Sequence, residues 1–191
     1  MSAELPPAPK PIALENDFVR VSRDNAPFAS AAAQGSGDRV VVAMGQMTVA
    51  VGSTPRALTR GQFAVVERGQ SYEVPAGASF FEVAIKPDHP SVTPPAEMIP
   101  PAKNLMLYEC DRFFIYEERL GPGDIRPRHS HCQRVEIRLN NGPMLDQWFD
   151  PPRPPLQPTI VNWREPVIHT VRNIGDAPLR NLIIEFKPPR G

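Results

Sequence analysis

Short apolar runs, closed by proline, glycine, asparagine or aspartate, recur along the chain. Three of them, Phe113–Glu117, Val135–Leu139 and Asn181–Phe186, are rich in β-branched and aromatic residues, a composition that favours strands. Asn141-Gly142 and Gly175-Asp176 predict tight turns, because asparagine and glycine tolerate positive φ. The pattern predicts an all-β protein built from small antiparallel barrels or sandwiches.

Helices are expected only as short pieces. The chain contains 25 prolines in 191 residues, and proline disrupts helix interiors. One helical turn is predicted at Ser30–Ala33 and another between Ala96 and Leu107. The longest apolar runs, such as Val40–Met44, are far shorter than the roughly 20 residues that span a bilayer.

Similar landmarks occur twice in the same order, which indicates a duplicated unit. Arg39-Val40 begins an apolar strand as Arg134-Val135 does, and Phe81–Pro87 closes the first half as Leu182–Pro188 closes the second. Between the halves lies the proline-rich stretch 87–103, which cannot form a helix or a central strand. We therefore expect a first domain over 1–87, a linker over 88–103 and a second domain over 104–191.

Charge and targeting signals exclude several classes of function. Lysine and arginine together number 21, as do aspartate and glutamate, so the formal net charge is zero. This balance argues against a nucleic-acid-binding protein, which needs a cationic excess. The first residues, MSAELPPAPKPIALEN, contain no apolar run of the length found in a signal peptide. We expect a cytoplasmic protein that is not bound to a membrane.

Histidines supply the candidate chemistry. Three of the four histidines, His129, His131 and His169, fall in the second half, and His89 lies in the linker. His129 and His131 are two positions apart, so on a strand both face the same side. Glu136 lies within an apolar strand, where a carboxylate is costly to bury unless it is paired or binds metal. Three imidazoles and a carboxylate suit Mn, Fe, Co, Ni or Zn.

The spacing of these residues resembles the cupin family. Its first motif runs Gly, five residues, His-x-His, three or four residues, Glu, then six residues to Gly. The matching residues are Gly123, His129, His131, Glu136 and Gly142, with five residues rather than six before the last glycine.

The second cupin motif, Pro-x-Gly-x-x-His-x-x-x-Asn, is eroded in this chain. Pro166-Val-Ile-His169-Thr-Val-Arg-Asn173 keeps the spacing from histidine to asparagine and loses the glycine and two positions.

The resemblance implies a bicupin, two jelly-roll barrels in tandem. It makes His129, His131, Glu136 and His169 the ligands of one divalent transition metal, with a satisfied polar core as the alternative. Aligning the halves places Val41 opposite Glu136 and Tyr72 opposite His169. The first barrel is therefore expected to bind no metal and to have an apolar or aromatic interior.

Other residues are candidates for the pocket. Arg138 lies two positions after Glu136 and should share its inward face, either binding an anionic substrate or forming a structural ion pair. Cys132 should face the opposite side, and a disulfide between Cys110 and Cys132 is left open. The aromatic candidates for the pocket wall are Trp148, Phe149 and Trp163, and the proline-rich loop Asp150–Pro158 is expected to form a rim.

By this resemblance, we expect a metal-dependent enzyme acting on a small, anionic organic molecule, by dioxygenase, decarboxylase or isomerase chemistry. The alternative is a non-catalytic ligand-binding or sensor bicupin. Glu185 and Tyr116 are candidates for a general base. Fold alone does not decide between these functions, and the sequence leaves open whether the chain is a monomer or a homodimer.

Overall fold

The chain forms two separate β units. The computed structural model describes residues 11–24, 28–30, 37–101, 104–140, 145–152 and 159–188. Within these ranges all regular secondary structure is strand, and no helix is present that could cross a membrane. The division between the units falls between Pro90 and Ser91. The expectation of an all-β protein with two tandem jelly-roll barrels is confirmed.

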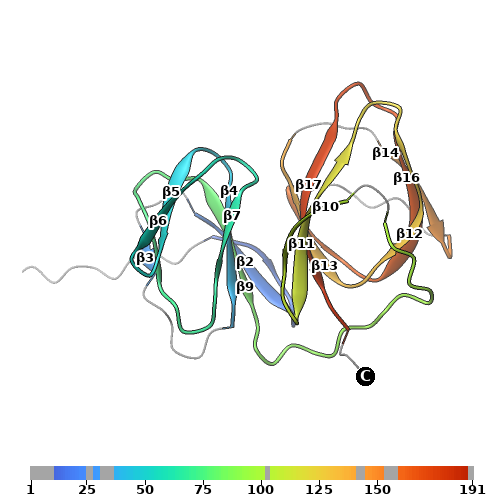
Figure 1. Cartoon of the computed structure of the whole chain (residues 1–191). Helices are drawn as coiled ribbons and strands as arrows, with labels where there is room; N and C mark the ends of the chain where they lie inside the picture. The colour runs from blue at the N-terminus through green and yellow to red at the C-terminus, as the bar shows by residue number, and fades with distance from the viewer. Residues whose placement is uncertain are drawn as a thin grey trace, which may run out of the picture. The chain divides into compact units, whose positions relative to one another are not determined.

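The first unit consists of two antiparallel sheets (Figure 1). One has the order β1-β2-β9-β4-β7, with β1 at Ile12–Glu15, β2 at Val19–Asp24, β9 at Phe80–Ile85, β4 at Arg39–Ala43 and β7 at Phe63–Val66. The other has the order β3-β8-β5-β6, with β3 at Phe28–Ser30, β8 at Tyr72–Val74, β5 at Met47–Val51 and β6 at Thr54–Leu58.

The second unit repeats this plan, and Figure 1 shows its two sheets facing each other. The larger sheet has the order β10-β11-β17-β13-β15, with β10 at Asn104–Glu109, β11 at Phe113–Leu120, β17 at Leu179–Phe186, β13 at Arg134–Arg138 and β15 at Val161–Arg164. The smaller sheet has the order β12-β16-β14, with β12 at Ile125–His131, β16 at Val167–Asn173 and β14 at Leu145–Asp150.

Strand registers show that the two units are built alike. Arg39 pairs with Ala84 across β4 and β9, and Arg134 pairs with Glu185 across β13 and β17. These pairs agree with the sequence alignment of the two halves, so Val41 of β4 occupies the position of Glu136 in β13. Strand β8 lies between β3 and β5 as β16 lies between β12 and β14.

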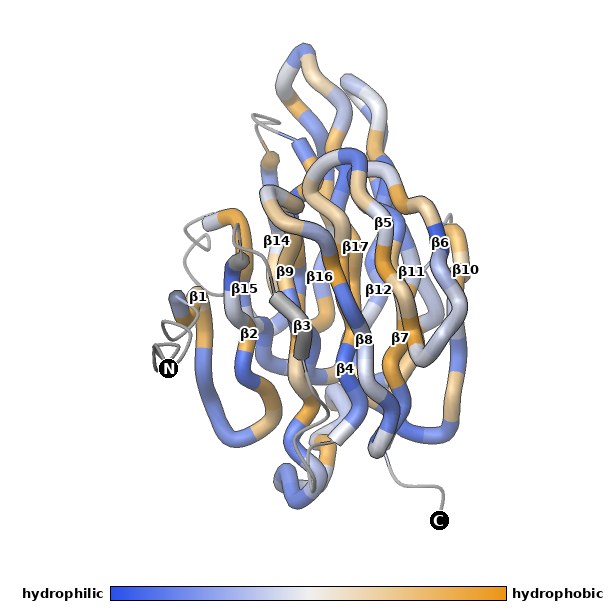
Figure 2. The backbone as a smooth tube through the Cα atoms, turned by 90° about the vertical axis from the view of Figure 1, so that its left-hand side faces the viewer, coloured by the Kyte–Doolittle hydropathy of each residue, from blue (hydrophilic) through white to orange (hydrophobic). Residues whose placement is uncertain are grey.

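Hydrophobic and hydrophilic positions alternate over short distances in both units, as the tube in Figure 2 shows. Alternation places every second side chain in the interior of a barrel. The interior of the first unit is an apolar cluster with one aromatic phenol, made of Val41, Ala43, Met47, Val49, Leu58, Ala64, Val66, Tyr72, Val74, Ala78 and Phe80. This agrees with the apolar or aromatic interior that the sequence predicts.

The described part of the proline-rich stretch is extended and partly attached to the second unit. The amide of Thr93 donates to Gln133 Oε1 at 2.9 Å, and the amide of Ile99 donates to Ser130 Oγ at 2.7 Å. The amide of Ser130 donates in return to the carbonyl of Ile99 at 2.9 Å. Ser91 to Pro101 therefore runs along β12 and counts with the second unit.

The described residues contain neither of the predicted short helices. Asn104–Glu109, in the region where the second was expected, forms strand β10, because its backbone pairs with β11 in an antiparallel ladder. Ser30 ends strand β3, and residues 31–33 lie outside the described ranges. The predicted turn at Gly175-Asp176 lies between β16 and β17, where the Gly175 amide donates to Asn173 Oδ1 at 3.1 Å; the turn at Asn141-Gly142 also lies outside them.

Candidate metal centre

Three histidines meet inside the second barrel. His129 and His131 lie on β12, and His169 lies on β16 directly opposite His129 in the ladder. One ring nitrogen from each lies within 4.8 Å of the other two, and the ring centroids are 4.5 to 5.3 Å apart. All three side chains are buried, with exposures of 1%, 3% and 6%. This is the group that the His-x-His spacing and His169 predicted.

The position of His129 depends on an irregularity in β12. The pairing register between β12 and β16 shifts between Arg126 and His129, where Pro127 has no N–H for the ladder. The Nδ1–H of His129 donates to the carbonyl of Pro127 at 2.7 Å. Its Nε2 is buried and has no hydrogen-bond partner in the described residues. A buried, unpaired imidazole nitrogen is costly, and a metal ion would satisfy it.

The carboxylate of Glu185 contacts the imidazole of His131 at Nδ1. Its Nδ1 lies 2.9 Å from Glu185 Oε2 and 3.0 Å from the hydroxyl of Tyr116. Tyr116 donates to the same carboxylate oxygen at 2.7 Å, and Glu185 Oε1 accepts the amide of Cys132 at 2.7 Å. With Nδ1 occupied, Nε2 is the nitrogen that His131 offers to a ligand, an arrangement typical of carboxylate–histidine–metal sites.

Burial keeps the imidazoles of His129 and His131 neutral. It is the main cause that lowers the pKa of His129 to about 4, with smaller contributions from the charges of Arg126 and Arg134. Burial lowers the pKa of His131 well below its ordinary value, and Arg134 lowers it further. Neutral imidazole is the form that binds metal, so His129 and His131 can bind a cation over the whole physiological pH range.

The pKa values of Glu185 and Tyr116, the two partners of His131, are also shifted. Burial raises the pKa of Glu185, although the charge of Arg134 opposes this shift. The pKa of Tyr116 is raised first by burial and then by the charge of Glu185. The two residues that the sequence marked as candidate bases are thus engaged with each other and with His131.

Glu136 does not join the histidine group. Its carboxylate accepts hydrogen bonds from the guanidinium of Arg164 at 3.2 and 3.4 Å and from Asn162 Nδ2 at 3.4 Å. Arg164 belongs to β15, which pairs with β13. The fourth ligand that the sequence predicts is therefore bound to an arginine in this structure.

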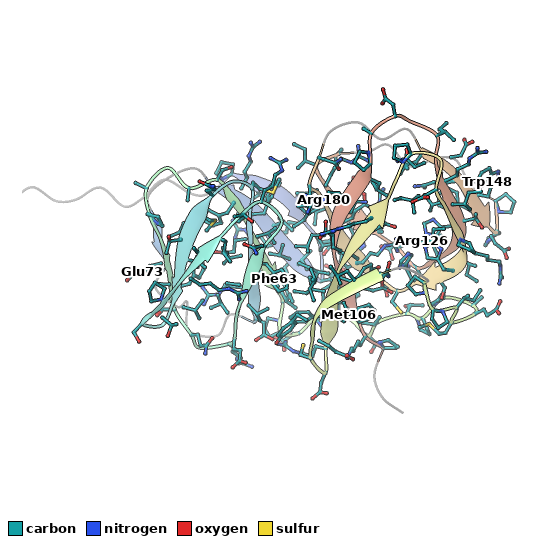
Figure 3. All side chains as sticks on the ribbon, turned by 45° about the horizontal axis from the view of Figure 1, so that its top comes forward. Phe63, Glu73, Met106, Arg126, Trp148 and Arg180 are labelled. Atoms are coloured by element: carbon teal, nitrogen blue, oxygen red, sulfur yellow. The ribbon has the colours of Figure 1, made fainter. Side chains whose placement is uncertain are left out.

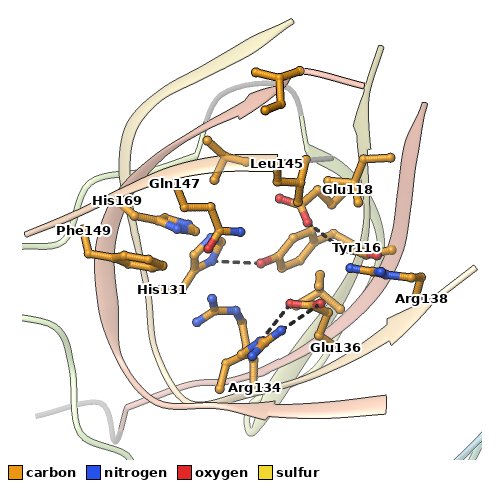
Figure 4. A pocket seen from close by; sticks show the side chains of 16 residues that line it. Tyr116, Glu118, His131, Arg134, Glu136, Arg138, Leu145, Gln147, Phe149 and His169 are labelled. Atoms are coloured by element: carbon orange, nitrogen blue, oxygen red, sulfur yellow. Dashed lines mark hydrogen bonds and ion pairs between the residues drawn. The ribbon is translucent and has the colours of Figure 1, made fainter. Parts of the chain in front are cut away.

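A cavity of about 340 Å³ opens beside the histidines, and Figure 4 shows its walls. His131 and His169 lie on one side of it and Arg138 on the opposite side. One face of β13 contributes Arg134, Glu136 and Arg138 to its polar lining. Its apolar lining consists of Leu145, Phe149, Val171, Ile174, Leu179 and Ile183. This space is of the size that small-molecule sites occupy in proteins.

Arg138 lies on the cavity wall, as strand alternation predicted. Its Nε is buried and lacks a hydrogen-bond partner in the described chain, and no carboxylate there forms an ion pair with it. Glu185, the competitor that the sequence suggested, is occupied by His131 and Tyr116. A partly buried guanidinium with open N–H groups is suited to binding an anion.

Two further charged groups near the cavity, Arg126 and Arg134, were not predicted from the sequence. Arg126 is fully buried and forms an ion pair with Glu118, which also accepts from Asn181 Nδ2 at 2.9 Å. Arg134 is 4% exposed and lines the cavity. Alternation from Glu136 could have identified Arg134, because the two residues are two positions apart on one strand.

Of the three aromatic candidates only Phe149 lines the cavity. Trp148 is 52% exposed and points away from the barrel, whereas Arg126 lies inside it (Figure 3). Trp163 packs against Phe186 with centroids 5.9 Å apart. Alternation along β14 explains the different positions of Trp148 and Phe149, since neighbouring residues face opposite sides.

The two cysteines are not joined in a disulfide, and Cys132 is buried. Burial raises the pKa of the Cys132 thiol to about 11, so it behaves as a core side chain. Most of the loop expected to form a rim, residues 153–158, lies outside the described ranges.

Comparison with solved structures shows which known proteins have a similar architecture. AerE from Microcystis aeruginosa matches with a TM-score of 0.64 at 13% identity, covering 95% of this chain and 98% of that chain. A cupin 2 conserved barrel domain protein from Leptotrichia buccalis matches with a TM-score of 0.55 at 12% identity, covering 98% and 92%. Oxalate decarboxylase from Bacillus subtilis, described with Mn(II) centres, matches with a TM-score of 0.52 at 12% identity, covering 91% and 69%.

No protein-family model matches the chain, and no curated protein matches it in sequence. The structural likeness, together with two similar barrels, shows the cupin fold. The chain is a bicupin in architecture, with a buried histidine triad in its second barrel only, as far as the described residues extend.

Proposed function

We propose that the chain is a metal-dependent enzyme acting on a small anionic organic molecule in its second barrel. The observation that carries this proposal is a buried triad of histidines beside a cavity whose opposite wall presents an arginine without an anionic partner in the described residues. We assign one divalent transition metal to His129, His131 and His169. Glu136 is bound to Arg164 and is left out of this ligand set.

The three imidazoles suit Fe, Ni and Zn in particular, and Mn and Co are candidate ions beside them. Such an ion supplies a Lewis acid that polarises substrate oxygens. The protein residues then have separate tasks. Glu185 holds His131 in its orientation, Arg138 binds a substrate carboxylate, and the apolar wall excludes water. The Mn(II) centres reported for the structurally similar oxalate decarboxylase support a metal in a barrel of this fold.

A non-catalytic ligand-binding bicupin is the second candidate, and one observation favours it. Each described carboxylate on the cavity wall is already engaged, Glu118 with Arg126 and Glu136 with Arg164. A free general base is therefore not evident there. Turnover of small carboxylates and diketones, screened with and without O₂ on metal-loaded protein, separates the two functions, because a binding protein would retain the ligand unchanged.

Elemental analysis after incubation with each metal tests the metal site directly. We expect about one ion per chain for the natural sequence and a large loss in His129→Ala and in His169→Ala. His89→Ala is the matched control, because His89 stacks on Phe18 in the first unit and should leave the metal content unchanged. Absence of bound metal in the natural sequence under all five ions would remove the enzyme proposal.

A further inference from the structure

Two arginines on one face of β13 line the cavity without a carboxylate bound to them. Arg134, Glu136 and Arg138 alternate on the strand and all three line the cavity. The other cavity charges are matched in pairs: Glu136 is held by Arg164 and Glu118 by the buried Arg126. For Arg134 and Arg138 the described residues provide no ion pair.

Arg134 is the more deeply buried of the two. Its only hydrogen bonds in the described chain are long ones from Nη1, to the carbonyls of Cys132 at 3.3 Å and Glu165 at 3.5 Å. A guanidinium has five N–H donors, so most of its capacity is unused. Glu185, opposite Arg134 in the ladder, already accepts from Tyr116 and the Cys132 amide and lies beside His131. Removing a guanidinium from water with so few partners is expensive.

The two arginines lie at different ends of the cavity. Arg134 pairs in the ladder with Glu185, whose carboxylate contacts His131, so Arg134 belongs to the histidine end. Arg138 lies across the cavity from His131 and His169 (Figure 4). Four residues along a strand separate their Cα atoms by about 13 Å. The remaining wall is apolar, from Leu145, Val171, Leu179 and others.

We propose that the natural ligand is an organic diacid with an apolar body, one acid group at Arg138 and the other at Arg134 beside the histidine triad. This inference rests on the proposed function and narrows its substrate class. A monoacid places a carboxylate at one arginine only and leaves most N–H donors of the other unused. A diacid satisfies both and fills the apolar part of the cavity. A two-carbon diacid is too short to reach both ends.

The test compares a diacid with a monoacid of the same chain length and with a much shorter diacid. Calorimetric titration of the purified protein, with its metal content measured, would use hexanoate, adipate and oxalate. We expect adipate to bind at least tenfold more tightly than hexanoate or oxalate. In Arg138→Met the ratio of adipate to hexanoate affinity should fall to about one. Arg172→Met is the matched control, because Arg172 is exposed on β16, and it should keep the tenfold preference.

Arg134 needs a gentler change because its side chain is buried. Arg134→Lys keeps the charge and loses the fork of donors, and we expect it to reduce the adipate preference at least threefold with an unchanged circular dichroism spectrum. Equal affinity for adipate and hexanoate in the natural sequence would overturn the diacid inference and leave the proposed function standing. If neither acid binds, the anionic-substrate part of the proposed function fails as well.

Discussion

The two barrels place different side chains at equivalent positions of the same ladder. Val41 and Tyr72 of the first barrel correspond to Glu136 and His169 of the second, and Ala84 corresponds to Glu185. Tyr72 is fully buried in an apolar cluster, and its hydroxyl donates to the carboxylate of Glu82. In the second barrel the corresponding space holds a histidine triad and a cavity.

This comparison shows that the fold tolerates either a packed core or a polar site at the same depth. Both barrels keep a buried arginine at the start of the equivalent strand, Arg39 in β4 and Arg134 in β13. The guanidinium of Arg39 lies over the ring of Tyr72, 5.3 Å from its centroid, where an aromatic face can receive it. Arg134 lies on a cavity wall instead. The inward-facing residues, rather than the strand plan, therefore separate structural from functional roles.

Removing Tyr72 should give the largest effect. Tyr72→Ala deletes a fully buried aromatic ring, and such deletions cost about 3–5 kcal/mol of unfolding free energy. His169→Ala, at the equivalent place beside an existing cavity, should cost less than about 2 kcal/mol because the site is not closely packed. Urea unfolding followed by circular dichroism measures both. Equal losses in the two variants would contradict the distinction between core and site.

Acid should destabilise the second barrel specifically. The pKa of His129 is about 4 in the folded chain, below the ordinary value of 6.5. The unfolded chain therefore takes up this proton first, and stability falls as the pH drops from about 6.5 to about 4, by up to about 3 kcal/mol. Both tryptophans, Trp148 and Trp163, belong to the second unit, so their fluorescence reports its unfolding. His129→Gln should reduce this dependence and leave the part that comes from the lowered pKa of His131. A slope that is the same in the variant would refute the assignment to His129.

Glu185 should act through His131. We expect Glu185→Gln to weaken metal affinity about 10–100-fold, the range seen when a carboxylate behind a ligating histidine is changed, with the metal stoichiometry unchanged. Competition against a chromophoric chelator measures the affinity. Glu117→Gln is the control, because Glu117 pairs with Arg119 and Arg180 outside the cavity. An unchanged affinity in Glu185→Gln would mean that His131 is oriented by packing alone.

Glu136 should give the smallest effect on metal. Because its carboxylate is held by Arg164, Glu136→Gln should change metal affinity by less than about threefold. The same chelator competition measures it. A drop of tenfold or more would restore Glu136 as the fourth ligand, which the sequence motif implies, and would show that it exchanges Arg164 for the ion.

The sequence by itself determined the strand-rich architecture, the duplication and, at the site, the three histidines and Arg138. Alternation of side chains is a local property of a strand, so His129, His131 and Arg138 could be assigned to inner faces without knowing the fold. The alignment of the halves, which sets Tyr72 against His169, also follows from local landmarks. The predicted helix between Ala96 and Leu107 failed because sheet pairing overrides weak local propensity.

Only the tertiary structure decided which carboxylate pairs with which arginine or histidine. Glu136 is paired with Arg164 from β15, and Glu185 is placed behind His131 together with Tyr116. These contacts join strands far apart in sequence, and their choice depends on the register of two ladders at once. Several carboxylates and arginines share one barrel, and electrostatic energy falls with distance. Their pairing, and the arginines left over for a ligand, are therefore fixed by packing in three dimensions.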